Sequence, residues 1–216
     1  MAKCIIDYFK DRHSQKTSNY HHGNLKEELL KNAVDIIHND GIETLTLSEL
    51  SKRLGTSRSA IYRHFSSKNE LIQNVLAYGF QMFEKDISEV FMQNEMNILS
   101  RLHAMGKIYV NFGIEHSNLY RILFGEKFQI LRTETCPIED EEKAPGFHSL
   151  VNLIKEAQEK NIFIIQDPML QGHIIHSMMH GLVSLYIDGH IHIKDNIDEL
   201  YELSFDTLIN GFTIKK

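Results

Sequence analysis

The chain has 216 residues with three prolines, twelve glycines and no tryptophan, a composition that favours helix and fits one large domain or a small module joined to a larger one. No apolar run approaches the roughly 18 residues that a membrane helix needs, and residues 1–11 lack the apolar core of a signal peptide, so we expect a cytoplasmic protein. The only cysteines, Cys4 and Cys136, are too few for a disulfide framework or a thiolate metal cage, and we expect both to be reduced.

Charge is unevenly distributed along the chain. The formal net charge is −6, but residues 1–68 hold 11 Lys and Arg against 8 Asp and Glu, whereas the other 148 residues hold 12 against 21. A basic segment joined to an acidic one suits a DNA-binding protein, because attraction to phosphate needs only a local cationic face. A positive excess of this modest size can also arise by chance.

The first predicted helix covers residues 24–39. Before it, residues 1–19 carry four basic side chains but no lasting periodicity, so they are interpreted as a flexible arm that could follow a DNA backbone or have no role. Asn24 suits an N-cap, and Asn39-Asp40-Gly41 is a stop signal. Apolar residues recur between them at the spacing of one helix face: Leu25, Leu29, Ala33, Ile36 and Ile37.

Two short helices are predicted next, over residues 47–54 and from Ser57 to about Phe65. Thr46 and Glu49 have the spacing of a capping box, and Gly55 permits a tight turn between the helices. Helices this short are unstable alone, so their apolar residues must pack against the first helix, which gives a three-helix helix-turn-helix unit.

The third helix has a polar, basic outward face. At 100° per residue, Ile61 and Phe65 share one side, and the other side carries Arg58, Ser59, Tyr62 and Arg63. Such a helix can enter a DNA major groove, where side-chain donors read base edges. An ordinary solvated helix face remains the alternative.

A long fourth helix, about 68–94, would link the helix-turn-helix unit to the rest of the chain. Five further helices are expected at about 97–115, 117–124, 145–161, 168–187 and 196–212, with Asp195 capping the last, so the fold class is all-α with about nine helices. Residues 125–144 form the longest irregular stretch, and their acidic run 139–142 is interpreted as a solvated loop. No nucleophile elbow, P-loop or paired-carboxylate motif supports an enzyme.

The segment from Tyr20 to Leu71, YHHGNLKEELLKNAVDIIHNDGIETLTLSELSKRLGTSRSAIYRHFSSKNEL, resembles the DNA-binding domain of the TetR/AcrR family of transcription regulators. Its densest part is TSRSAIYRHFSSKNEL, which keeps the recognition-helix serine, the tyrosine, His-Phe and the lysine of the family pattern, and the turn glycine of that pattern is Gly55 directly before it. Ser59 replaces a frequent glycine and Thr56 a frequent valine. The second half resembles the subgroup with a WHG ligand domain in YHHGNL, in EHSNLYRILFG (Glu115 to Gly125) and in HSMMHGLVSLYIDG (His176 to Gly189), although Met179 stands where that subgroup has its tryptophan.

The resemblance implies a domain division and roles for single residues. Residues 1–19 would be the arm, 20–67 the helix-turn-helix domain and 68–216 a helical ligand-binding and dimerisation domain. Hydroxyl, imidazole and ammonium groups would hold phosphates, and Arg58 and Ser59 would face bases. Ser57 could be a helix cap alone, and His64 a partly buried histidine bonded to a carbonyl. The DNA-binding residues expected are Thr46, Ser57, Arg58, Ser59, Tyr62, Arg63, His64 and Lys68.

The same resemblance implies a homodimer and a ligand cavity. The last two helices would pair with those of a second copy, or serve the monomer's own core; the available residues are Leu170, Ile174, Leu182, Leu185, Leu200, Leu203, Phe205, Leu208 and Ile209. The cavity would take a small, mainly apolar ligand. Its expected lining residues, each of which could instead be ordinary core, are Met105, Tyr109, Phe112, His116, Phe128, Met178 and His180.

The function expected is therefore a DNA-binding regulator, a repressor that binds a palindromic operator as a homodimer and is released by its ligand, with no cofactor and no membrane partner. Two alternatives remain open. His173, His176 and His180 fall at i, i+3 and i+7 on one helix face and could bind a metal in a metal-responsive regulator. The chain could also act as a DNA-bound interaction protein without any ligand.

Overall fold

The computed structural model describes residues 25–92, 95–131, 144–191 and 196–214. Over these residues every regular element is a helix, apart from one isolated β-bridge between Phe163 and Thr213. The all-α class is therefore confirmed. Several sequence predictions lie outside the described residues: the arm 1–19, the Asn24 cap, the acidic run 139–142, both cysteines and Asp195.

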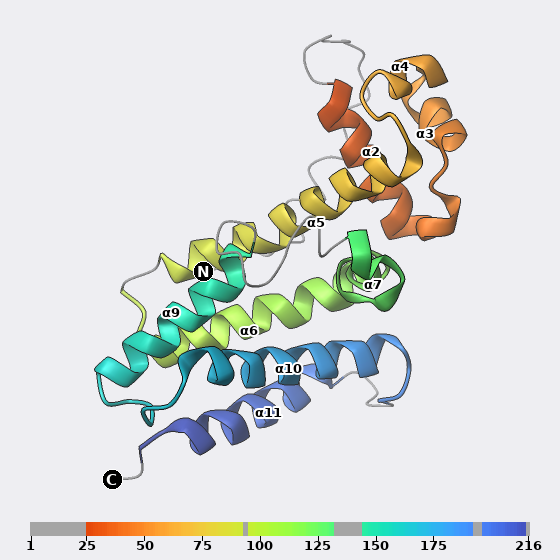
Figure 1. Ribbon diagram of the computed structural model, residues 1–216. Coiled ribbons are helices and arrows are strands. Elements are labelled where there is room, and N and C mark those ends of the chain that lie inside the picture. Colours follow the sequence, from red (N-terminus) through yellow and green to blue (C-terminus); the bar gives the residue numbers. More distant parts are fainter. Residues whose placement is uncertain (1–24, 93–94, 132–143, 192–195, 215–216) are drawn as a thin grey trace.

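Three helices gather at one end of the molecule (Figure 1). They are α2 (Leu25–Asp40), α3 (Leu47–Leu54) and α4 (Arg58–Tyr62), with a short 3-10 turn, η1 (Ile42–Thr44), between the first two. Their small core contains Leu29, Ile36, Leu50 and Ile61, all fully buried. We refer to α2, α3 and α4 together as the head.

Helix α5 (Lys68–Phe91) leaves the head and runs along the rest of the molecule (Figure 1). It packs against α2 near its start and against the later helices α6 (Ile98–Glu115), α7 (Ser117–Phe124) and α9 (Pro145–Glu159) along its length. Buried side chains therefore form one continuous cluster from α2 to the C-terminal helices.

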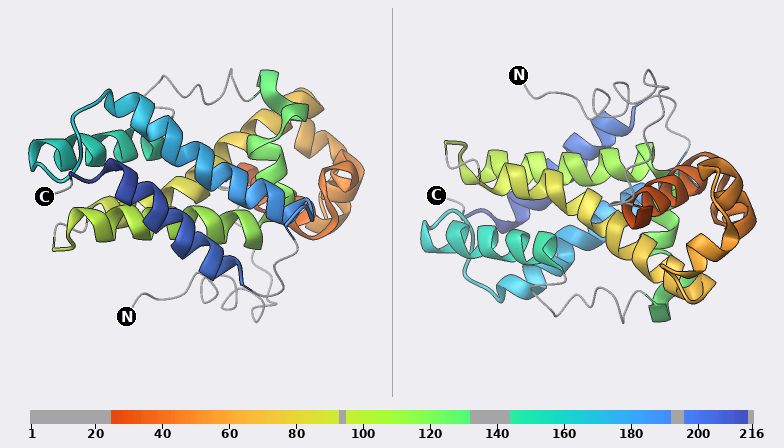
Figure 2. Two further views of the ribbon diagram at one scale, coloured as in Figure 1. Left: turned by 90° about the horizontal axis from the view of Figure 1, so that it is seen from below. Right: turned by 90° about the horizontal axis from the view of Figure 1, so that it is seen from above.

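The remaining helices build a layered body (Figures 1 and 2). Helix α10 (Pro168–Ile187) packs against α6 on one side and α9 on the other, and α11 (Ile197–Phe212) covers α6 and α10. A second 3-10 turn, η2 (Glu126–Phe128), follows α7. Within the described residues no helix is long and apolar enough to cross a membrane.

Three helix ends differ from the predicted ones. Helix α4 ends at Tyr62 because the chain turns there and buries Phe65 completely. Helix α9 ends at Glu159, where Asn161 takes a left-handed conformation with φ 54°. The cap of α11 is Asn196, whose side chain accepts a hydrogen bond from the Glu199 N–H.

The close approach of α6 to α10 depends on glycine. A Cβ built on Gly113 would overlap Val183 Cγ1, and one on Gly106 would lie 2.6 Å from Met179 Cε. The first clash involves a β-branched side chain with little rotamer freedom, whereas the second involves the flexible end of Met179 together with the buried Tyr201 hydroxyl at 2.7 Å. Gly113 has the shorter contact of the two, to Val183 Cγ1.

We predict that Gly113→Ala lowers the free energy of unfolding, because overpacking of about 1–3 kcal/mol exceeds the gain of about 1 kcal/mol in helix propensity. The matched control is Gly79→Ala, whose Cβ would meet only leucine methyl groups at 3.0 and 3.3 Å. Urea unfolding followed by circular dichroism measures both variants. Equal stabilities would mean that α6 and α10 can separate freely.

Candidate functional site

Side-chain caps fix the helix starts of the head. The Thr46 side chain accepts from the Glu49 N–H at 3.1 Å, and Ser57 accepts from the Ala60 N–H at 3.2 Å. Between the two helices, Gly55 takes the left-handed conformation, with φ 59°. The predicted caps and turn are confirmed, although the Glu49 carboxylate binds Arg53 instead of completing the box. The turn between α3 and α4 is thereby set by local hydrogen bonds.

All of the predicted DNA-binding residues are exposed except His64, which is half-buried. Tyr62 is 53% exposed, unusual for a side chain of its size. The Arg58 guanidinium donates to Ser48 Oγ at 2.7 Å, which joins the starts of α4 and α3. Lys68 is the first residue of α5, whose cap Ser67 accepts from the Glu70 N–H.

The basic residues of the head differ in their partners. Arg53 is neutralised by Asp40 at 2.6 Å and Glu49 at 3.2 Å. Among the described residues, no carboxylate lies within ion-pair distance of Arg58, Arg63 or Lys68. Cationic groups that are exposed and not paired with carboxylates are suited to binding phosphate oxygens.

A polar contact joins the head to the body. At the end of α2, the His38 carbonyl accepts from Asn118 Nδ2 at 3.1 Å, and the His38 and His116 rings share a hydrogen bond between their Nδ1 atoms at 3.2 Å. His116 is 6% exposed. Burial, with the nearby His38 ring, lowers the pKa of His116 to about 4. We refer to this contact as the His38–His116 junction.

A cavity of about 300 Å³ lies in the body between α5, α6, α9 and α10. Its wall is mostly aromatic and aliphatic, as in ligand pockets generally. The lining residues are Phe80, Phe83, Glu84, Ile87, Leu102, Met105, Gly106, Tyr109, Phe124, Ala144, Gly146, Phe147, Leu150, Ile175, His176, Met179 and His180.

Three of the predicted lining residues, Met105, Tyr109 and His180, are on this wall. The structure places the other four elsewhere. Phe112 and His116 lie against each other further along α6, and Phe128 lies in η2 beside Lys127. Met178 is half-buried beside Ile174 and Leu203 on the outer side of α10 and α11, because it directly precedes the inward Met179. Glu84 and His176 also line the cavity, although the sequence did not predict either as a lining residue.

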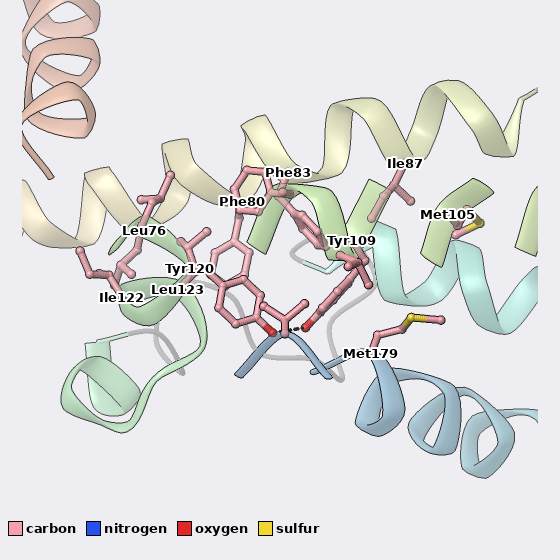
Figure 3. Close-up of a cluster of buried hydrophobic side chains, with 14 of the residues drawn as sticks. Leu76, Phe80, Phe83, Ile87, Met105, Tyr109, Tyr120, Ile122, Leu123 and Met179 are labelled. Carbon is pink, nitrogen blue, oxygen red and sulfur yellow. Dashed lines mark hydrogen bonds between the residues drawn. The ribbon is translucent and has the colours of Figure 1, made fainter. Parts of the chain in front are cut away.

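Hydroxyl and imidazole groups form a chain beside the cavity. Tyr109 and Tyr120 share a hydrogen bond between their hydroxyls at 2.9 Å, which Figure 3 draws as a dashed line. Tyr109 also bonds His176 Nε2 at 3.3 Å, and Tyr120 bonds His180 Nδ1 at 2.7 Å. Burial lowers the pKa of His176 to about 4 and raises the pKa of both tyrosines, so His176, Tyr109 and Tyr120 are neutral near pH 7. We call this the Tyr–His chain.

Met179 occupies the position at which the resembling subgroup has its tryptophan. It is 2% exposed and its methyl group enters the space left by Gly106. The histidines at i, i+3 and i+7 do not converge: His173 packs on Phe147, while His176 and His180 bond different tyrosines. Over the described ranges, no group of three or more His, Cys, Asp or Glu side chains is arranged to hold a metal ion. The metal-site alternative is therefore not supported.

Comparison with protein families gives two matches. A model described as bacterial regulatory proteins, tetR family, matches residues 29–75, and one described as tetracyclin repressor-like, C-terminal domain, matches residues 102–208. The chain belongs to the TetR family. This TetR-family chain is accordingly a DNA-binding transcription regulator, and the first match contains α3, α4 and the start of α5.

Relatives of this TetR-family chain are distant. Nucleoid occlusion factor SlmA of Vibrio cholerae serotype O1 is 28% identical over 103 residues, 47% of this chain and 52% of that protein. The chain thus spans about half the length of the curated relatives it matches.

A structure of a protein of unknown function from Rhodococcus sp. RHA1 covers 92% of this chain and 100% of its own, with TM-score 0.76 and 23% identity. The structure of the ketosteroid transcriptional regulator KstR2 of Mycobacterium tuberculosis covers 88% of this chain and 95% of its own, with TM-score 0.61 and 19% identity. These structures show the shared fold.

The buried His116 predicts how the stability of this TetR-family chain depends on pH. Its folded pKa of about 4 lies below the unfolded value of 6.5, so the unfolded state binds more protons between these values. The contribution of neutral His116 to stability is therefore fully present above about pH 6.5. The free energy of unfolding falls as the pH drops towards 4, and this group accounts for on the order of 3 kcal/mol of the fall.

His116→Phe should make the fall in unfolding free energy between about pH 6.5 and 4 shallower, because it removes the titrating group. The exposed His190 provides the control His190→Phe, which should leave the slope as it is. Urea unfolding at several pH values measures both slopes. The same slope in His116→Phe and the parent protein would exclude His116 as the source.

Proposed function

We propose that this chain is a repressor that binds a palindromic operator as a homodimer and leaves it when a small, mainly apolar ligand occupies the cavity. The proposed division is residues 20–67 for DNA binding and 68–216 for ligand binding and dimerisation. One observation carries the proposal: helix α5 reaches from an exposed face, whose cations have no carboxylate partner among the described residues, to an apolar cavity.

In the proposed complex, α4 enters the major groove. Arg58 and Ser59 face base edges, and Thr46, Tyr62, His64 and Lys68 hold phosphates. Arg58 must rotate from Ser48 or bring that hydroxyl with it, since the two are bonded in the free protein. Ser57 caps α4 and its hydroxyl lies 2.8 Å from that of Ser59, so we assign it a supporting contact.

The proposed dimer uses the outer face of α10 and α11. Four large apolar side chains are exposed there: Leu170 by 62%, Ile174 by 51%, Leu185 by 46% and Leu203 by 65%. An apolar patch of this kind on a single chain marks an interaction site. Leu182, Phe205 and Ile209 are already buried within the chain, so they serve its own core.

A second candidate is a DNA-bound protein that acts without a ligand. The name nucleoid occlusion factor, carried by SlmA, is the observation that favours it. The apolar cavity favours the ligand-responsive regulator instead, because small-molecule sites are typically mostly apolar cavities of this size with a few polar groups.

Lys68→Ala should weaken binding to every DNA sequence alike and lower the slope of log affinity against log salt by about 0.9, the value for one lost phosphate contact. Selection from random DNA supplies the operator, which we expect to be palindromic. Lys155→Ala, an exposed lysine of α9, is the matched control and should leave the slope unchanged. A parent-like slope in Lys68→Ala would remove Lys68 from the DNA contact.

Leu203→Lys should convert the dimer to a monomer, because it places a charge in the apolar face of α11. Ile165→Lys is the control, since Ile165 is 81% exposed but outside the α10 and α11 helices. Sedimentation velocity gives the mass of each variant. A dimeric Leu203→Lys variant would mean that the chain pairs through another surface.

A further inference from the structure

The cavity wall carries one acidic side chain and no basic one among the described residues that line it. The acidic group is Glu84. The remaining polar groups are Tyr109, His176 and His180, and all three bond within the Tyr–His chain. These three groups are therefore already engaged in hydrogen bonds within the protein, whereas the Glu84 carboxylate has capacity for a ligand.

Glu84 interrupts the apolar stripe by which α5 faces the cavity. Phe80, Phe83 and Ile87 are buried on the same wall. A carboxyl group in an apolar wall has an energetic cost unless it meets a cation or several hydrogen-bond donors. Burial accordingly raises the pKa of Glu84 to about 7. A carboxylate at this position gains most from a positively charged partner.

The described part of the protein provides few hydrogen-bond donors for the Glu84 carboxylate. Among the described residues its side-chain partner is the Gly146 N–H, at a long 3.5 Å. Gly146 packs closely against this side chain, since a Cβ built there would lie 3.3 Å from Glu84 Cγ. Glu84 is only half-buried and lines the cavity, so its carboxylate is accessible to a group placed there.

We infer that the effector is a cationic amphiphile, with an amine or ammonium group against Glu84 and an apolar body along the aromatic wall. This rests on the proposed function. Phe83 and Phe147 line the same cavity, and aromatic rings also attract cations. A ligand with its own carboxylate would meet Glu84 with no basic side chain of the described wall to balance it, so fatty-acid-like anions are disfavoured.

The test uses three probes with the same apolar body: phenylbutylamine, phenylbutanol and phenylbutyrate. Calorimetry at about pH 8 keeps Glu84 mostly ionised, since its pKa is about 7. We expect the amine to bind about tenfold or more tighter than the alcohol, the size of one charge-assisted hydrogen bond, and the acid to bind most weakly.

Glu84→Gln keeps the shape of the side chain and removes its charge. It should bring the affinity of the amine down to that of the alcohol while leaving the alcohol within about threefold. Glu89→Gln, an exposed glutamate on the same helix, should retain the amine preference. Thermal unfolding of both variants checks that they are folded.

The outcomes separate this inference from the proposed function. If the alcohol binds as tightly as the amine, the cationic class is wrong, and if Glu84→Gln still prefers the amine, Glu84 is not the group that recognises it. In both cases the inference fails while ligand binding by the cavity stands. If none of the three probes binds to the parent protein up to its solubility limit, ligand binding by the cavity fails and the inference fails with it.

Discussion

Helix α5 is the element on which the rest of the structure depends. The head helices α3 and α4 have 8 and 5 residues and cannot be stable alone. The first half of α5 packs against α2 of the head and carries the buried side chains Leu71, Ile72, Val75 and Leu76. Its second half supplies Phe83 and Ile87 to the cavity wall. With 24 residues, α5 is about 36 Å long, so one rigid element belongs to both cores.

A second connection runs through α7 and narrows the ways in which the head can move. Tyr120 on α7 bonds His180 beside the cavity, and Asn118 at its start bonds the His38 carbonyl of α2. The sequence pattern suggested that α5 alone would link cavity and head. With two helices holding the head, a ligand has to shift α5 and α7 together, so a movement of the head as a unit is more consistent with these contacts than bending of one helix.

Local features of the sequence predicted the structure well, because they depend on residues close in the chain. The caps at Thr46 and Ser57 and the turn at Gly55 follow from side chains bonding their own neighbours. The cavity was predicted less well. Helical periodicity predicts which face of α6 points inward. The extent of the cavity along α6 depends on how α9 and α10 pack against this helix, and no local sequence pattern specifies that packing. Phe112 and His116 lie on the correct helix, about one turn or more beyond the wall.

Two residues were missed for different reasons. His38 was interpreted only as part of a helix end, and its partner His116 is 78 residues away in sequence. Glu84, in contrast, had a visible signal: an acidic residue among Phe80, Phe83 and Ile87 on one helix face. A charged residue inside an apolar stripe is often the mark of a functional site, because its cost must be balanced by a partner or by function. A periodicity pattern that considers only apolar residues does not reveal an acidic residue of this kind.

The central claim is that the cavity and the DNA-binding face share one conformational equilibrium. A ligand found by thermal-shift screening can be titrated into the free protein and into the protein saturated with operator. Coupling of about 1–3 kcal/mol predicts an affinity weaker by about 5- to 150-fold in the presence of operator, and the ligand must weaken operator binding by the same factor. Equal ligand affinities in the two titrations would contradict the account for that ligand, however tightly it binds.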